Sequence, residues 1–260
     1  MTTALLVFPN QLFADHPGLQ DRPDRVVLVE DPLFFGDPTY PATFHKQKLW
    51  LHRASMAQYS ARLASAGHAV TPIAYQRDVR LIDTTLATLA ADGATHIFAA
   101  DPVDFTAERR LRRAADAAEV SLTLLPTPLF LNETADNQFW AQGRKRWFMA
   151  EFYKYQRRRL DVLMEGDAPA GGQWSFDEDN RKKVPKAMLA QIPEIPILTH
   201  DALDFDARDS VSRDFPDAYG TLTTLYYPTT HDQAADWLDR FLHDRFHLFG
   251  DYEDAIVEGE

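Results

Sequence analysis

Short apolar runs alternate with helical patterns along the first half of the chain. Five such runs, rich in β-branched residues, each predict a buried strand, over residues 4–8, 25–30, 69–75, 95–100 and 121–125. Between them, apolar residues recur three or four positions apart, which is typical of amphipathic helices over residues 46–66, 81–91 and 106–118. Strands that alternate with helices pair in parallel through right-handed crossovers. The pattern therefore predicts an α/β fold with a doubly wound, five-stranded parallel sheet over residues 1–130.

The pattern changes after residue 130. Residues 131–200 contain a charged helical segment, a glycine-containing stretch over 166–172 and several prolines, which together predict a connector. Residues 201–260 carry 15 acidic and four basic residues. In that tail, Thr230–Gln233 has the pattern of a capping box. An apolar helix face follows it, formed by Trp237, Leu238, Phe241, Leu242 and Phe246. We expect this face to pack on the sheet or on a further domain, because one amphipathic helix cannot bury it alone.

Composition and charge narrow the possible chemistry. The 260 residues are 45% hydrophobic, which is ordinary for a globular protein. Because the chain has no cysteine, it forms no disulfide, holds no iron–sulfur cluster through its own thiolates and has no cysteine nucleophile. A net charge of −12 argues against unspecific coating of nucleic acid. With no run of about 18 apolar residues and no basic start of a signal peptide, we expect a soluble, cytoplasmic protein without a membrane partner.

The end of the first predicted strand is a candidate ligand site. Doubly wound sheets bind ligands outside the carboxyl ends of their strands, where the strand order reverses. Asn10, Gln11 and Leu12 follow the first strand, and the two amides suit a flat heterocycle, although a turn satisfied by asparagine is the alternative. His52, on the helical segment 46–66, either lines the same site or packs in the core.

The end of the second predicted strand is the next candidate. It carries two carboxylates and an aromatic pair in the run Glu30, Asp31, Pro32, Leu33 and Phe34, which continues into a second phenylalanine. A carboxylate at this place commonly accepts a ribose or sugar-alcohol hydroxyl, and the rings could stack on a planar ligand. The alternative is an Asp-Pro turn above core phenylalanines.

A basic segment stands out against the acidic chain. Residues 141–160 contain seven lysines or arginines and one glutamate, interleaved with aromatic residues. Such a stripe can hold nucleic-acid phosphates while its rings stack, or it can pair with the acidic tail, and the two uses are compatible. The candidates for DNA contacts in and after this segment are Arg144, Lys145, Arg157, Arg158, Lys182 and Lys183.

Several stretches together resemble the photolyase/cryptochrome superfamily, and within it the prokaryotic iron–sulfur branch that includes bacterial (6-4) photolyases. The matching stretches are NQL at 10–12, FHKQKLWLHRASM at 44–56, GRK at 143–145, MAEFYKYQRRRLDVLMEGDAPAGGQWSFDEDNRKKVP at 149–185 and FGDYEDAI at 249–256. The run over 149–185 is long and distinctive, and the resemblance covers essentially the whole chain.

The resemblance implies a division into three parts. Residues 1–130 would form an antenna-chromophore domain, 131–200 an interdomain connector with a basic helix, and 201–260 the beginning of a helical FAD-binding domain. Family members are much longer, and their second half holds FAD and, through cysteines, a [4Fe-4S] cluster. The missing carboxyl-terminal helical domain is therefore an expected partner, and we expect this chain alone to be inactive in repair.

The resemblance also implies binding sites. The antenna of this branch is 6,7-dimethyl-8-ribityllumazine, and by position its pocket would use Asn10, Gln11, Leu12, Glu30, Asp31, Pro32, Leu33, Phe34 and His52. Two departures stand out, because the stretch 36–43 looks longer than in relatives and Phe34 replaces a more polar residue. Asp177 and Asp254 match acidic positions linked to cation-assisted repair, with Arg181 beside them. Two carboxylates with waters would suit Mg²⁺.

The resulting hypothesis is that the chain is the amino-terminal antenna and DNA-facing part of a light-driven, FAD-dependent photolyase. We expect this photolyase to act on pyrimidine photoproducts of the (6-4) type in UV-damaged DNA. Two alternatives stay open. One is a cryptochrome-type blue-light signalling protein without repair, and the other is a stand-alone nucleotide-binding α/β protein.

Overall fold

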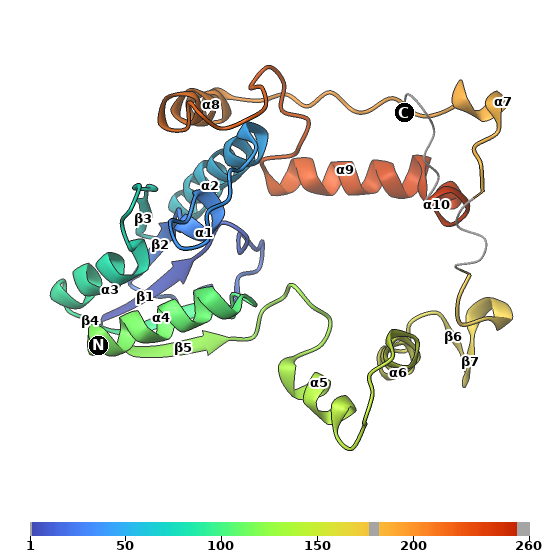
Figure 1. Ribbon diagram of the computed structural model, residues 1–260, viewed down its shortest axis with the longest axis horizontal. Coiled ribbons are helices and arrows are strands. Elements are labelled where there is room, and N and C mark those ends of the chain that lie inside the picture. Colours follow the sequence, from blue (N-terminus) through green and yellow to red (C-terminus); the bar gives the residue numbers. More distant parts are fainter. Residues whose placement is uncertain (1, 177–181, 254–260) are drawn as a thin grey trace. The chain divides into compact units, whose positions relative to one another are not determined.

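The computed structural model describes residues 2–176 and 182–253 (Figure 1). The chain divides into two compact units. The first, which we call the sheet unit, comprises Met1–Phe130 and Ile197–Ala234, and the second unit comprises Leu131–Pro196 and Ala235–Glu260. The acidic tail is thus shared between the two units.

The sheet unit contains the predicted five-stranded parallel sheet. Its strands are β1 (Thr2–Val7), β2 (Arg25–Val29), β3 (Val70–Ile73), β4 (Ala94–Ala100) and β5 (Ser121–Leu125). They lie in the order β3-β2-β1-β4-β5, and every neighbouring pair is parallel. Central β1 pairs with both β2 and β4, so that Leu5 stands opposite Val26 and Phe98. The predicted α/β fold class is confirmed, and the strand order reverses beside β1.

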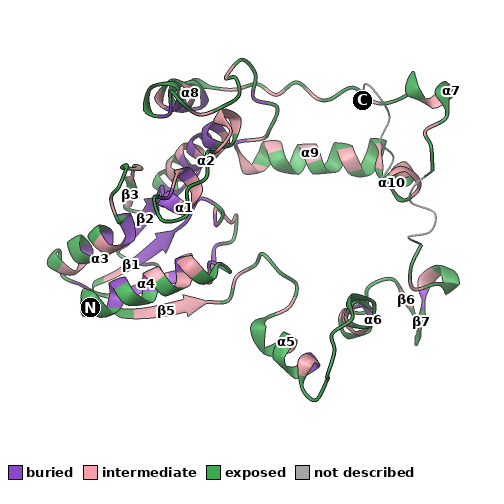
Figure 2. Ribbon diagram, viewed as in Figure 1, coloured by how far each residue is buried: buried purple, intermediate pink, exposed green. Residues whose placement is uncertain are grey.

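Helices cover both faces of this sheet, which explains why the strands are apolar on both sides (Figures 1 and 2). Helices α3 (Leu81–Ala91) and α4 (Phe105–Ala117) pack with Leu6 and Phe8 in one core cluster. Helices α2 (Lys46–Ser65) and α8 (Ala202–Asp214) pack with Leu5 and Val7 in the other. The indole N–H of Trp50 on α2 donates to the carbonyl of Asp204 on α8 at 2.7 Å. This bond anchors the returning segment to the sheet unit.

Two shorter helices lie next to the candidate segments. Asp31 begins α1 (Pro32–Phe35), where its carboxylate accepts the N–H of Leu33 at 2.9 Å. The predicted capping box begins α9 (His231–Asp244), because Gln233 accepts the N–H of Thr230 and the hydroxyl of Thr230 accepts the N–H of Gln233. A one-turn 3-10 helix, η1 (Pro17–Leu19), follows the first strand.

The second unit is built from short elements. These are α5 (Thr134–Ala141), α6 (Met149–Leu160), the two-residue strands β6 (Met164–Glu165) and β7 (Ala168–Pro169), the turn η2 (Ala170–Gly172), α7 (Lys186–Leu189) and α10 (Phe246–Tyr252). In the same unit, Phe241 packs edge-on against Phe246 and Phe249, whereas Leu238 and Leu242 are exposed. The predicted apolar face of α9 is therefore only partly covered. Among the described helices, none has both the length and the apolar character needed to cross a bilayer.

Candidate functional site

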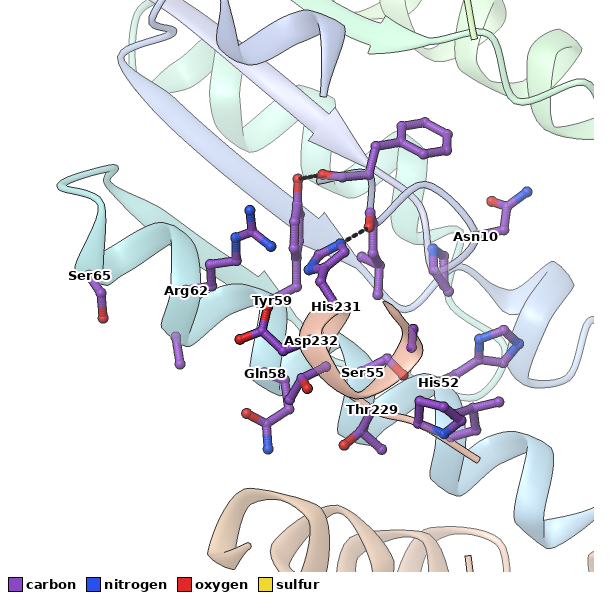
Figure 3. Close-up of a pocket in the computed structure, with 18 residues that line it drawn as sticks. Asn10, His52, Ser55, Gln58, Tyr59, Arg62, Ser65, Thr229, His231 and Asp232 are labelled. Carbon is purple, nitrogen blue, oxygen red and sulfur yellow. Dashed lines mark hydrogen bonds between the residues drawn. The ribbon is translucent and has the colours of Figure 1, made fainter. Parts of the chain in front are cut away.

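One candidate site is a cavity of about 650 Å³ in the sheet unit, between the end of β1, helix α2 and the start of α9 (Figure 3). We call it the β1–α2 cavity. Three of the residues predicted from the sequence line it, namely Asn10, Leu12 and His52. Further polar groups come mainly from one side of α2 and from the turn before α9, and they include Ser55, Gln58, Tyr59, Arg62, Thr229 and His231. The cavity thus combines apolar walls with hydrogen-bonding groups of both kinds.

Two hydrogen bonds hold one wall of this cavity in place (Figure 3). The imidazole Nε2 of His231 lies 2.8 Å from the carbonyl oxygen of Leu12, and the hydroxyl of Tyr59 donates to the carbonyl of Phe13 at 2.9 Å. Burial raises the pKa of Tyr59 to about 12, so the hydroxyl stays protonated and remains a donor. The segment after β1 is therefore fixed to α2 and α9 by its own backbone carbonyls.

His52 is the titratable residue most changed by its surroundings in this cavity. Its ring meets Phe34 edge-on at 5.8 Å between centroids and lies 5.9 Å from the ring of Phe35. Burial, with a smaller effect of Lys48, lowers the pKa of His52 to about 4. The ring is therefore neutral at physiological pH, and its buried Nε2 has no hydrogen-bond partner among the described residues.

The carboxylate of Glu30, predicted as a ligand-binding group, forms hydrogen bonds with other residues of the sheet unit. Its carboxylate accepts from Arg53 at 2.9 and 3.0 Å, and it also accepts the N–H of Tyr75 at 2.8 Å. Arg53 in turn donates to Ser210 and Asp214 of α8. Glu30 thus ties β2 to α2 and, through Arg53, to α8. The sequence signal for Arg53 is its position on the apolar face of α2, since an arginine is rarely buried unless it is paired.

The side chain of Gln11 also forms hydrogen bonds within the sheet unit. Its side chain is fully buried, donates to the carbonyl of Ala100 at 2.9 Å and accepts the N–H of Phe8. It therefore connects the ends of β1 and β4, and it does not line the β1–α2 cavity. Of the two predicted amide residues, Asn10 lines this cavity and Gln11 does not.

Asp31 and Pro32 line a different cavity of about 510 Å³, which we call the α3–α4 cavity. Its other walls come from the loop after α1 and from helices α3 and α4. Burial raises the pKa of Asp31 to about 6, and its hydrogen bond from the N–H of Leu33 opposes this shift. Leu33 is half-buried, and Phe34 contacts both core clusters. Of the nine predicted pocket residues, three line the β1–α2 cavity and two line the α3–α4 cavity, whereas Gln11, Glu30, Leu33 and Phe34 line neither.

The second unit carries the predicted DNA contacts, and their environments differ. Arg157 is buried, donates to the carbonyls of Val162 and Leu163, and lies over the ring of Trp174 at 5.3 Å. Arg158 also lies over the ring of Trp174, with its guanidinium carbon 4.5 Å from the ring centroid, but Arg158 is exposed. The packing of Arg157 is that of a structural residue.

The remaining predicted cations of this unit lie at the surface. Arg144 donates to the carbonyl of Trp140 and lies over its ring, whereas Lys145 and Lys183 are exposed. Lys182 forms an ion pair with Asp251 of the acidic tail at 2.8 Å. The ion pairs shown for α6 itself connect Lys154 to Glu151 and Arg159 to Asp136, outside the tail.

The predicted cation site cannot be built from the described part of the chain. Asp177, Arg181 and Asp254 lie outside the described residues. Within residues 2–176 and 182–253, no group of three or more histidines and carboxylates has an arrangement suited to a metal ion. The Mg²⁺ site therefore stays a prediction.

Comparisons with known proteins match this chain to one family and to individual relatives. A family described as "Deoxyribodipyrimidine photo-lyase-related protein" matches residues 5–227. A (6-4) photolyase from Agrobacterium fabrum is 27% identical over 272 aligned residues, which cover 100% of this chain and 51% of the relative. An uncharacterized protein of Acanthamoeba polyphaga mimivirus is 29% identical over 195 residues, 73% of this chain and 98% of that protein. The chain thus spans about half the length of the (6-4) photolyase that it matches.

Proposed function

Because the chain belongs to the deoxyribodipyrimidine photo-lyase-related protein family, we propose that its sheet unit binds a light-harvesting chromophore for a light-driven, FAD-dependent photolyase. The lesion that we propose is the (6-4) pyrimidine photoproduct in UV-damaged DNA, and the similarity to a (6-4) photolyase supports this choice. The chromophore that we propose is 6,7-dimethyl-8-ribityllumazine.

The β1–α2 cavity carries this proposal. Its volume of about 650 Å³ lies within the range of roughly 300–1,000 Å³ that is typical of small-molecule sites. A flat bicyclic ring would find apolar walls at Leu12 and Leu51, and its carbonyl and ring nitrogens would find a donor in the amide of Asn10. Ser55 and Arg62 offer donors to the hydroxyls of a ribityl chain. The residues present therefore fit the group.

The electron-transfer chemistry would belong to the flavin. When bound, FAD supplies the electron that splits the photoproduct, and in the proposed assembly it is held by a helical domain together with a [4Fe-4S] cluster. This chain has no cysteine with which to ligate such a cluster. Its own contribution is to bind the chromophore, and to present exposed cations such as Arg144, Lys145, Arg158 and Lys183 to DNA phosphates.

Chromophore retention tests the proposal. The purified chain is incubated with 6,7-dimethyl-8-ribityllumazine and desalted, and the absorbance and fluorescence of the retained ligand are measured. We expect stoichiometric retention by the natural sequence and a loss of retention in Ser55→Trp, because the indole fills the cavity from α2. Asp31→Asn is the matched control, since it changes only the other cavity and should retain the chromophore.

Two outcomes would contradict this assignment. Failure of the natural sequence to retain the lumazine, with its circular dichroism intact, would show that the cavity does not take this chromophore. Unchanged retention by Ser55→Trp would show that the chromophore binds elsewhere on the chain.

A further inference from the structure

The α3–α4 cavity has the features of a second ligand site, and the proposed function makes no use of it. We propose that it binds a nucleoside phosphate, with the phosphate at Arg80, Arg109 and Arg113 and the nucleoside towards Asp31 and Tyr40. This cavity and the β1–α2 cavity have no lining residue in common.

Three of the four arginines that line this cavity form the proposed phosphate site. Arg80 immediately precedes α3, and Arg109 and Arg113 lie one turn apart on α4. The N-terminal end of the 11-residue helix α3 lies beside Arg80 and brings its positive dipole end to the same place, although Asp83 in its first turn offsets part of that dipole. Guanidinium groups bind phosphate through paired, charge-assisted hydrogen bonds, and their convergence on one cavity favours a phosphate ligand.

The carboxylates of the cavity leave these arginines accessible. Asp37 accepts two hydrogen bonds from Arg110, and these two residues form the most buried ion pair shown for the cavity. Arg113 and Arg80 both pair with Asp83, at 3.0 and 3.9 Å, but the two arginine side chains are 55% and 79% exposed. Pairs this exposed contribute little that a phosphate could not replace. The contact shown for Arg109 is with the ring of Phe105, at 5.3 Å. Its guanidinium has no hydrogen bond or ion pair within residues 2–176 and 182–253, and we expect its donors to serve a ligand.

The other end of the cavity suits a nucleoside. Asp31 is 2% exposed and lines the cavity directly after β2, which is the place where doubly wound sheets receive ribose hydroxyls. Tyr40 lines it from the opposite loop, half-exposed, with its ring 5.7 Å from the Arg110 guanidinium carbon. An exposed aromatic face beside a cation offers a stacking surface for a planar base. The volume of about 510 Å³ lies within the range of roughly 300–1,000 Å³ typical of small-molecule sites.

Titration calorimetry of the full chain with three probes tests the proposal: adenosine 5′-monophosphate, adenosine and inorganic phosphate. We expect the nucleotide to bind at least about tenfold more tightly than either part alone, because only the nucleotide uses both ends of the cavity. Equal affinities for the nucleotide and for adenosine would show that the arginines do not bind the phosphate, which contradicts the proposal. No measurable binding of the nucleotide would overturn it.

Variants locate the site. Arg80→Gln combined with Arg109→Gln should weaken nucleotide binding by about tenfold or more, since charge-assisted hydrogen bonds are lost. Arg112→Gln is the matched control, because Arg112 lies on the same helix, pairs with Glu108 and does not line the cavity. Equal effects of the two changes would contradict the site. Ser55→Trp, which fills the other cavity, should leave nucleotide binding unchanged, and a loss there would show that the two ligands share one site.

Discussion

Among the described residues, the sheet unit and the second unit each bury one arginine, and they do so in different ways. Arg53 in the sheet unit is 8% exposed and pairs with the carboxylates of Glu30 and Asp214. Arg157 in the second unit is 7% exposed, but its partners are the backbone carbonyls of Val162 and Leu163 and the ring of Trp174. The first arginine joins elements far apart in the sequence, whereas the second shapes one local turn.

The apolar residues show the same contrast (Figure 2). In the sheet unit, central strand residues such as Leu5 and Leu6 are completely buried between helices. In the second unit, Phe139, Trp147 and Met149 are each at least 70% exposed. The sheet unit thus has a core of its own, while the second unit is held by local contacts. We therefore expect the two units to differ in stability and in their response to substitution.

The largest effect is expected from Arg53. Arg53→Met leaves the buried carboxylate of Glu30 without its partner, and this should cost about 3–5 kcal/mol of unfolding free energy. Arg157→Met leaves only carbonyl acceptors unpaired, and we expect a loss of about 1–3 kcal/mol. Hydrogen exchange of the α2 and α6 amides measures the two units separately.

The double variant Glu30→Gln with Arg53→Met is the control for the first effect. It removes the unpaired charge and should recover part of the lost stability. A larger loss from Arg157→Met than from Arg53→Met would reverse the comparison of the two units.

The sheet could be predicted from the sequence because its signals are local. Each strand and helix has its own apolar period, and the parallel order follows from their alternation. The site was predictable only in part. Glu30 and Asp31 are neighbours in the sequence, yet Glu30 meets Arg53 of α2 while Asp31 lines the cavity beside α3 and α4. The two side chains thus leave the end of β2 in different directions, and their neighbourhood in the sequence does not show this.

Other parts of the site depend on contacts across the whole chain. Arg53 meets Asp214, which is 161 positions away, and Leu12 meets His231, which is 219 positions away. No periodic pattern in the sequence indicates such pairs. What the sequence does show is an arginine on a helix face that must be buried, and such a residue requires a partner.

The next effect concerns acid. Burial lowers the pKa of His16, as of His52, from 6.5 to about 4. As the pH falls, each histidine is therefore protonated in the unfolded chain at a higher pH than in the folded chain. The contribution of each neutral histidine to the unfolding free energy is complete above about pH 6.5 and is lost as the pH falls towards 4. The loss should reach roughly 3 kcal/mol per residue. Both histidines belong to the sheet unit, so we expect acid to destabilise this unit.

Unfolding by urea at a series of pH values measures this loss. His16→Asn keeps an acceptor for the N–H of Gly18 but does not titrate, so its stability should fall less steeply below pH 6.5. His243→Asn, at an exposed position in the second unit, should change the stability by no more than about 0.5 kcal/mol at any of these pH values. The same acid slope in His16→Asn and the natural sequence would show that His16 is not a source of the acid sensitivity.

The smallest effect comes from two buried tryptophans. Trp50 of the sheet unit donates its indole N–H to Asp204, whereas the buried indole N–H of Trp140 in the second unit has no hydrogen-bond partner among the described residues. Trp50→Phe should therefore cost about 1–3 kcal/mol, because the carbonyl of Asp204 loses its donor. Trp140→Phe should change stability by less than about 1 kcal/mol, since a weakened contact with Arg144 is offset by removal of an unpaired N–H. Hydrogen exchange of the α8 and α5 amides measures the two changes in stability. Equal losses of stability would mean that the indole N–H of Trp140 has a hydrogen-bond partner in solution.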